Sequence, residues 1–289
     1  MILHRRRLLK SALAAPAIIR PRSALAWGES LSALRINPVP FGAAAADVTA
    51  AGFTKLALYD DFTDTSGIDV NNTLKPGYRF YVTSPSSSCS PQAFAASNSI
   101  LTFDNTITGV GGSIITQGYT ATPPYTVGQS YGGGGYYEIR YAILAGAYSE
   151  TFWMDDNAAA WIVRNGGSAT YGEIDVAEFF RQADPTNAIE DTAAWQWEGT
   201  EGTLVGLSTW PVLNMNSLHR FGMLWKTIAQ GGGTGSLKFY RDGVNAAGSN
   251  ITYSASDPLA ILDNSAFSLW LTNVRGKQLV DYIFCYQQP

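Results

Sequence analysis

The sequence predicts an all-β protein built as one sandwich of two packed antiparallel sheets. From residue 55 onward, short segments rich in β-branched and aromatic residues alternate with turn residues, and no long segment has the period of a helix. Glycine (29 residues), tyrosine (15) and tryptophan (8) are plentiful, while charged residues make up only 15% of the chain. A hydrophobic content of 46% over 289 residues can fill a sizeable core, which excludes a disordered chain.

Residues 1 to 26 resemble a twin-arginine export signal. The pair Arg5 and Arg6 precedes a short apolar run, and Ala24 and Ala26 offer the small residues that a signal peptidase recognises. The alternative is a basic amphipathic helix that is kept in the mature protein. The export signal predicts a periplasmic or extracellular location.

Charge and hydropathy exclude two kinds of partner. Removal of residues 1 to 26 leaves 13 basic against 23 acidic residues, a formal net charge of −10. Such a chain is repelled by polyanions, so we expect no nucleic-acid partner. No run of about 18 apolar residues is present, so we expect no membrane span. We expect a monomer.

Residues 27 to 52 are rich in alanine without clear alternation and predict a linker or an N-terminal arm, loosely packed, before a domain at 53–289. The two cysteines, Cys89 and Cys285, are too far apart for a CxxC motif. In an oxidising compartment they could form a disulfide, and two buried thiols are the equally weighted alternative.

The strands of the domain are predicted from eleven short segments bounded by turn residues. Asp242-Gly243 predicts a two-residue hairpin turn, because such a turn needs positive φ at both central positions. The glycine runs at 132–135 and 231–233 predict loops. The eleven segments are 56–62, 78–82, 99–103, 136–143, 151–154, 159–163, 173–180, 219–225, 237–243, 267–273 and 280–286.

One of these segments, "EIDVAEFF", carries three carboxylates spaced by two and then by three. Strand alternation places Ile174 and Val176 in the core and Glu173 and Asp175 on the opposite face, but gives Glu178 the wrong parity. A β-bulge near residue 176 or 177 would bring Glu178 onto the acidic face. A solvated acidic strand is the alternative, although three like charges on one face of a central strand cost stability. The spacing therefore indicates a functional row of acids.

The same residues resemble a known family. "GEIDVAE" at 172–178 resembles the bulged E-x-D-x-x-E signature of glycoside hydrolase family 16, of laminarinase and β-glucanase type. The resemblance extends from Leu58 to Gln287 through "LYDDF", "YYEIRYAI", "ETFWM", "LHRFGMLW", "LKFYRDG" and "VDYIFCYQ". It implies a concanavalin A-like jelly-roll β-sandwich that hydrolyses a β-linked polysaccharide.

The resemblance also implies roles for the three acids. Glu173 would be the nucleophile and Glu178 the general acid and base, in a reaction that retains configuration through a covalent glycosyl-enzyme intermediate. Retaining enzymes place these two carboxyl groups about 5 to 5.5 Å apart. Asp175 would orient Glu173 and help to keep Glu178 protonated. No cofactor is required for this chemistry.

Further residues are candidates for substrate and metal binding. Tryptophans near the acids in sequence can stack on sugar rings, with burial in the core as the alternative, and Arg140 and Asn273 can reach sugar hydroxyls. Asp281 lies where the family carries a ligand of a structural calcium ion, which the resemblance therefore makes possible here. The tryptophan candidates are Trp153, Trp161, Trp195 and Trp197.

Three departures from the family leave the polysaccharide open. Ala169 to Tyr171 stand where a tryptophan and a proline are frequent, Leu224 stands where a glutamate is usual, and Trp195 occupies or neighbours the place of a frequent histidine. Two alternatives to hydrolysis also stay open. One is a transglycosylase that passes the same intermediate to a sugar acceptor, and the other is a non-catalytic carbohydrate-binding sandwich.

Overall fold

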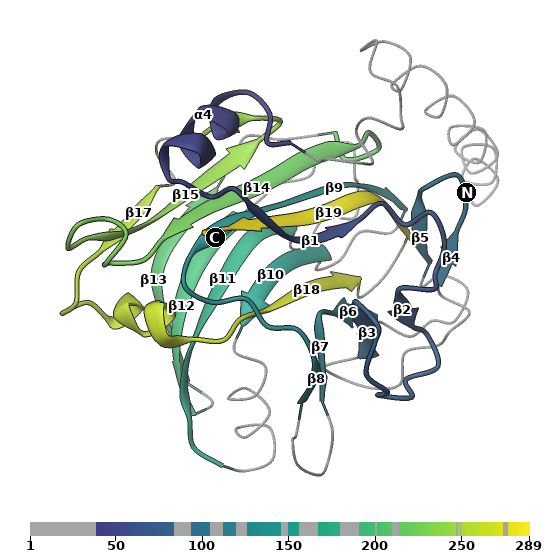
Figure 1. Ribbon diagram of the computed structural model, residues 1–289, viewed down its shortest axis with the longest axis horizontal. Coiled ribbons are helices and arrows are strands. Elements are labelled where there is room, and N and C mark those ends of the chain that lie inside the picture. Colours follow the sequence, from purple (N-terminus) through teal and green to yellow (C-terminus); the bar gives the residue numbers. More distant parts are fainter. Residues whose placement is uncertain are drawn as a thin grey trace, which may run out of the picture. The chain divides into compact units, whose positions relative to one another are not determined.

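The computed structural model describes residues 39–83, 94–104, 112–119, 126–145, 150–155, 167–179, 191–199, 201–209, 214–246, 248, 250–273 and 277–289. The predicted export signal, Cys89, Trp161 and the strand predicted at 159–163 lie outside these residues. Those from residue 40 onward belong to one unit, in which two large sheets face each other (Figure 1). None of the described helices is long and apolar enough to cross a membrane.

The first sheet has nine strands. Its main path runs β16-β15-β14-β9-β19-β5-β4, with β1 paired to β19 and β17 paired to β15. The strands are β1 (Lys55–Asp60), β4 (Phe94–Ala96), β5 (Leu101–Asp104), β9 (Gly135–Ala145), β14 (His219–Lys226), β15 (Gly235–Arg241), β16 (Val244–Asn245), β17 (Ile251–Tyr253) and β19 (Lys277–Gln287).

The second sheet has eight strands in the order β13-β12-β11-β10-β18-β6-β3-β2. All its pairs are antiparallel except the short pair β2–β3. A separate hairpin, β7 (Gln117–Tyr119) and β8 (Thr126–Gly128), follows β6. The eight strands are β2 (Ile68–Asp69), β3 (Phe80–Thr83), β6 (Gly112–Ile115), β10 (Glu150–Asp155), β11 (Thr170–Phe179), β12 (Asp191–Glu198), β13 (Glu201–Thr209) and β18 (Ser268–Asn273).

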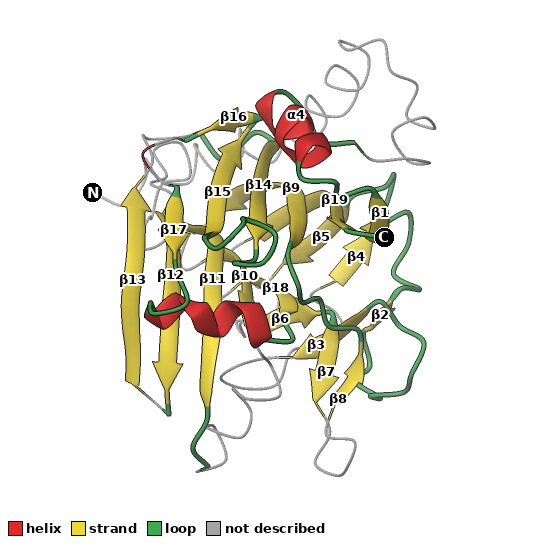
Figure 2. Ribbon diagram, turned by 60° about the vertical axis from the view of Figure 1, so that its left-hand side comes forward, coloured by secondary structure: helices red, strands yellow, loops and turns green. Residues whose placement is uncertain are grey.

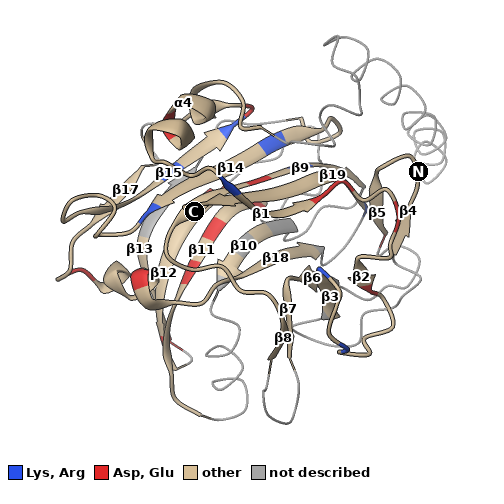
Figure 3. Cartoon of the chain, in the orientation of Figure 1, with Lys and Arg blue, Asp and Glu red and all other residues tan. Residues whose placement is uncertain are grey.

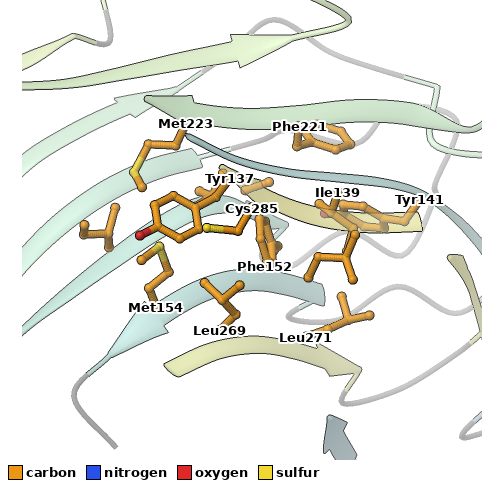
Figure 4. Close-up of a cluster of buried hydrophobic side chains, with 14 of the residues drawn as sticks. Tyr137, Ile139, Tyr141, Phe152, Met154, Phe221, Met223, Leu269, Leu271 and Cys285 are labelled. Atoms are coloured by element: carbon orange, nitrogen blue, oxygen red, sulfur yellow. The ribbon is translucent and has the colours of Figure 1, made fainter. Parts of the chain in front are cut away.

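The core lies between the two sheets and is built from every second residue of their strands. Figure 4 shows Tyr137, Ile139 and Cys285 of the nine-stranded sheet facing Met154 and Leu269 of the eight-stranded sheet, and all five side chains are buried. This arrangement confirms the predicted β-sandwich. The Cys285 thiol is free and buried in this core, so of the two alternatives for Cys285 the described residues show the buried thiol.

The prediction of a linker or loosely packed arm at 27–52 is wrong for the last part of this range, which forms a packed helix. Helix α4 (Ala43–Ala50) packs against the outer face of the nine-stranded sheet, and Ala44 and Val48 are buried there together with Phe53. This face carries apolar side chains because the strands alternate large residues on both sides, Phe284 of β19 among them. Burial of that surface explains why an alanine-rich segment without strong amphipathicity folds here.

Several sequence-predicted elements are confirmed. Asp242 and Gly243 have φ of 50° and 77°, as the predicted hairpin turn between β15 and β16 requires. The eleven predicted segments do not include β2, β4, β6, β7, β8, β12, β13, β16 and β17. All of these except β12 and β13 are four residues long or shorter. A 3-10 helix, η4 (Pro258–Asn264), packs on β11 and β12 and is the unlabelled helix that crosses them in Figure 2.

Candidate active site

The three predicted carboxylates lie on β11, on the face that points away from the core. Ile174, Val176, Ala177 and Phe179 all belong to the buried core, so two consecutive residues, Val176 and Ala177, face inward. Glu173 and Asp175 precede this pair and Glu178 follows it. The alternation of the strand is therefore interrupted once, between the second acid and the third.

The strand register shows the cause. Asp175 pairs with Ala193 of β12 and Glu178 pairs with Asp191, so two residues of β11 face a single residue, Thr192, of the partner strand. The pairing with β10 is shifted at the same place. This is the predicted β-bulge, and it brings Glu178 onto the face of the other two acids.

A glycine fixes the entry to this strand. A Cβ atom on Gly172 would lie 2.4 Å from Cδ2 of Leu262, which belongs to η4 and is buried in the core. A side chain at this position would force the Leu262 side chain to move from its place against β11. The glycine before Glu173 therefore lets η4 pack closely against β11 from the core side.

Asp175 is the central acid of the row and is almost completely buried. Its Oδ2 accepts a hydrogen bond of 2.9 Å from Nε1 of Trp195, and its carboxyl group is also hydrogen-bonded to Glu173. Burial raises the pKa of Asp175 to about 7, although both hydrogen bonds oppose the shift. The contact with Glu173 places Asp175 where it can orient that side chain.

Glu178 has the larger shift. Burial raises its pKa to about 9, and the negative charges of Asp175 and Asp191 add to the effect. A carboxyl group in this environment holds its proton at neutral pH, which a general acid requires. The sequence-based site did not include Asp191, because its register with Glu178 depends on the length and path of the 180–190 connection.

An aromatic row continues the outer face beside the acids. Trp195 pairs with Glu173, and Trp197 pairs with Tyr171, which lies two residues before Glu173 on the same face. The ring of Trp197 is stacked with Tyr171 (centroids 6.1 Å apart) and with Trp195 (5.9 Å). Tyr171 was not among the predicted site residues, although its parity with Glu173 was a usable signal.

Trp197 is also packed from the neighbouring strand. A Cβ atom on Gly202 of β13 would approach three atoms of the Trp197 ring to 2.9 to 3.0 Å. The Trp197 Nε1 is buried and has no hydrogen-bond partner among the described residues. Beyond the row, Leu204 of β13 pairs with Trp195 and is 41% exposed. The apolar surface therefore extends toward the edge of the sheet.

Two other predicted substrate-binding residues lie on strands close to the acids. Trp153 of β10 pairs with Asp175 on one side and with Trp270 of β18 on the other. Asn273 ends β18 and pairs with Glu150 of β10. The backbone therefore brings both positions to the same sheet as the carboxylates. Trp161 lies outside the described residues.

The prediction that Arg140 belongs to the site is wrong. It lies on β9 of the other sheet, and its neighbours Ile139 and Tyr141 are in the core, so its side chain points out of the opposite face of the sandwich. There Arg140 Nη1 forms an ion pair of 2.6 Å with Oδ2 of Asp281. The family motif gave the strand correctly, but alternation within the strand directs this side chain away from the acids.

Asp281 was the predicted ligand of a structural calcium ion. Its contact with the Arg140 guanidinium already balances its charge, and the described residues contain no group of three or more His, Cys, Asp or Glu side chains that could hold a metal ion. Calcium needs six to eight oxygen ligands. The described contact of Asp281 is this ion pair, and the calcium site stays a prediction.

Part of the outer face is covered. Trp270, Ile115 and Tyr81 lie on neighbouring strands of the eight-stranded sheet and form a separate buried cluster outside the main core. Cβ atoms on Gly118 and Gly128 would approach Tyr81 to 2.7 and 2.5 Å, so the β7–β8 hairpin lies directly on this cluster. The carboxylates thus lie between the hairpin and the edge strand β13.

The fold corresponds to one class of solved structures. The sandwich has the jelly-roll fold of glycoside hydrolase family 16, as the sequence motifs predicted. The laminarinase from Flavobacterium sp. UMI-01 is similar with a TM-score of 0.52 and 16% identity, covering 81% of this chain and 100% of that chain.

Two more solved structures show the same fold. SCLam, a non-specific endo-β-1,3(4)-glucanase from family GH16, gives a TM-score of 0.53 at 16% identity over 81% of this chain and 95% of its own. The endo-β-1,3-glucanase from Pyrococcus furiosus gives 0.50 at 14% identity, over 81% and 94%. No protein-family model and no curated protein matches the sequence.

Proposed function

We propose that the protein is a retaining endo-glycosidase that hydrolyses a β-linked polysaccharide. The observation that carries the proposal is the bulge in β11, which places Glu173, Asp175 and Glu178 on one outer face. Burial and neighbouring charge favour the protonated form of Glu178, while Glu173 is held by Asp175. A purely carbohydrate-binding surface would gain nothing from acids held in this way.

Glu173 and Glu178 would divide the reaction into two steps. In the first, a Glu173 oxygen attacks the anomeric carbon while Glu178 gives its proton to the departing glycosidic oxygen, and a glycosyl ester forms. In the second, the Glu178 carboxylate takes a proton from water, and the water oxygen displaces Glu173. Both residues return to their starting protonation states, and two inversions give net retention.

Trp195 would support this reaction by fixing Asp175. Its Nε1–H points at the buried carboxylate, and its ring is held by stacking on Trp197. An indole N–H donates a hydrogen bond at any working pH, whereas a histidine in this place would change its charge near neutrality. The donor to Asp175 is therefore independent of pH.

The charge of the sheet favours a polysaccharide without sulfate or carboxylate groups. The eight strands that the structure describes in this sheet contain no lysine or arginine, whereas the strands of the other sheet carry seven basic residues (Figure 3). An anionic sugar beside the four acids of the site would add like-charge repulsion. We therefore propose a neutral β-glycan as substrate.

The experiment that tests the proposal combines substrate choice with stereochemistry. Reducing ends are measured over a panel of neutral β-glucans, neutral β-galactans and sulfated galactans, and the configuration of the first product is followed by NMR. We expect cleavage of a neutral glycan with retention. Retention with transfer to added oligosaccharide in place of release would indicate the transglycosylase, and inversion or no cleavage would reject the proposed mechanism.

Variants of the two glutamates assign their roles. Glu173→Ala should abolish turnover, and azide should restore it with an inverted product, because the small anion attacks from the vacated side. Glu178→Ala should keep the first step on an aryl glycoside with a good leaving group, and azide should then give a retained product. Full activity of Glu173→Ala would show that Glu173 is not the nucleophile and would leave these acids with a structural role only.

The site of action is also proposed. We infer that residues 1 to 26 export the chain and that the mature protein acts outside the cytoplasm as a monomer. Substitution of Arg5 and Arg6 by lysine should leave the protein in the cytoplasm, as measured by cell fractionation. Unchanged export of the substituted chain would reject the twin-arginine assignment.

A further inference from the structure

A fourth carboxylate faces the proposed acid. Asp191 opens β12 and pairs directly with Glu178 across the bulge, so both side chains leave the sheet on the same outer face. Direct cross-strand partners have Cβ atoms about 4.5 to 5.5 Å apart. The two carboxyl groups are therefore close neighbours by the register of the sheet.

The Asp191 carboxylate has an unusual environment. Its Oδ1 is buried and has no hydrogen-bond partner among the described residues. Leaving a buried carboxylate oxygen unpaired costs free energy, so a residue kept only for structure would be expected to hold a donor. No hydrogen bond within the described residues accounts for the burial of Asp191 Oδ1. The residue that Asp191 faces across the strands is Glu178.

We propose that Asp191 is a positioning residue for the reaction, whose negative charge keeps the Glu178 carboxyl group protonated before the glycosidic bond breaks. The inference rests on the proposed function. Asp191 acts through Glu178 and takes no part in the bond changes of either step. It makes the ionised form of Glu178 less favourable, so Glu178 is loaded with its proton in the first step and is a stronger base toward water in the second.

Asp191 shares this role with one other charged group. On its own strand Asp175 also faces it and has the larger charge effect of the two, and that carboxyl group is in addition hydrogen-bonded to Trp195 and Glu173. On β10 the partner of Glu178 is Thr151, which has no ionisable group. The groups that raise the pKa of Glu178 are, after burial itself, Asp175 and Asp191.

The test is Asp191→Asn, which removes the charge and keeps the shape. In the plot of kcat against pH, the high-pH limb should move to lower pH by about one unit, while the low-pH limb and KM stay nearly unchanged. Asp191→Glu should keep the limb in place. Glu198→Gln, which removes an exposed charge from the other end of β12, is the matched control and should leave both limbs unmoved.

A second readout does not depend on catalysis. The infrared carbonyl band of the protonated Glu178 carboxyl group, assigned by its loss in Glu178→Gln, is titrated with pH in the wild type and in Asp191→Asn. If the asparagine variant does not fold, Asp191→Ser serves as the second neutral variant. The titration should move to lower pH in either one.

Each result decides the question. An unmoved titration in the neutral variants, a kcat loss that is equal at every pH, or an equal shift in Glu198→Gln would overturn the role of Asp191. If the wild type cleaves no glycan, the proposed function fails, while the infrared titration still shows whether Asp191 controls the proton on Glu178.

Discussion

At the scale of single residues, the site contains buried acids whose charged form is destabilised by the fold. The pKa values of Asp175 and Glu178 are raised, first by burial. Such groups serve the proposed chemistry but weaken the fold once they ionise. The cost of the site should therefore be visible in the pH dependence of stability, without any substrate.

We expect Glu178→Gln to stabilise the protein as pH rises. A folded-state pKa of about 9, against about 4.3 in the unfolded chain, means that the stability contributed by Glu178 is complete below pH 4 and is lost between about pH 4 and 9. The variant should therefore unfold at a higher temperature than the wild type by a margin that grows over this range, about 2–4 °C for each kcal/mol. Thermal unfolding at several pH values checks this, and a constant margin would contradict it.

A second residue prediction concerns the donor to Asp175. Trp195→Phe keeps an aromatic ring and removes the Nε1–H bond of 2.9 Å, so kcat should fall about 10- to 100-fold with a smaller change in KM. Trp197→Phe is the control, because the Nε1 of Trp197 has no described partner and its loss should act mainly on KM. Steady-state kinetics on the best glycan compare them, and equal kcat losses would exclude the hydrogen bond as the cause.

At the scale of elements, β11 shows what sequence can and cannot predict. The row of acids and its bulge followed from alternation, because Ile174, Val176 and Phe179 had to be buried while the acids could not be. The place of Asp191 opposite Glu178 did not follow, since a register depends on the connection between strands. The prediction for Arg140 was wrong for a related reason. The motif identified its strand, but the alternation of side chains along that strand decides which face of the sheet Arg140 points from.

The support of β11 by η4 gives a prediction at this scale. Gly172→Ala should lower the free energy of unfolding by about 1 to 3 kcal/mol, because its Cβ would lie 2.4 Å from Leu262 Cδ2. In combination with Leu262→Ala, which alone should cost about 2 to 5 kcal/mol, the glycine substitution should cost little more. Denaturant unfolding of the two single variants and the double variant measures this coupling. Additive losses would show that η4 does not press on β11.

At the scale of the whole molecule, both sheets carry something on their outer faces. The eight-stranded sheet carries the acids and the β7–β8 hairpin, and the nine-stranded sheet carries helix α4. The helix was not predicted, because its alanine-rich sequence has no clear pattern and the apolar face that it covers is assembled from distant strands. Contacts between residues this far apart in the chain cannot be predicted from a local stretch of sequence.

Docking of this segment should be important for stability. Phe53→Ala should cost about 3 to 5 kcal/mol, because its side chain is only 2% exposed on the outer face of the nine-stranded sheet. Phe41→Ala, at 43% exposure in the same segment, is the matched control and should cost about 1 kcal/mol or less. Chemical denaturation compares the two variants, and an equal small loss would show that the segment is not held against the sheet.

The position of β19 determines when the chain can fold. This strand is the last in the sequence, yet it lies inside its sheet and pairs with β1, β5 and β9. Until it has been synthesised, β9 and β5 present unpaired edges and the core around Cys285 stays open. Its pairing with β1, where Lys55 meets Gln287, also closes nearly the whole domain into one loop. The nascent domain should therefore stay largely unfolded, and depend on protection from aggregation, until β19 has left the ribosome.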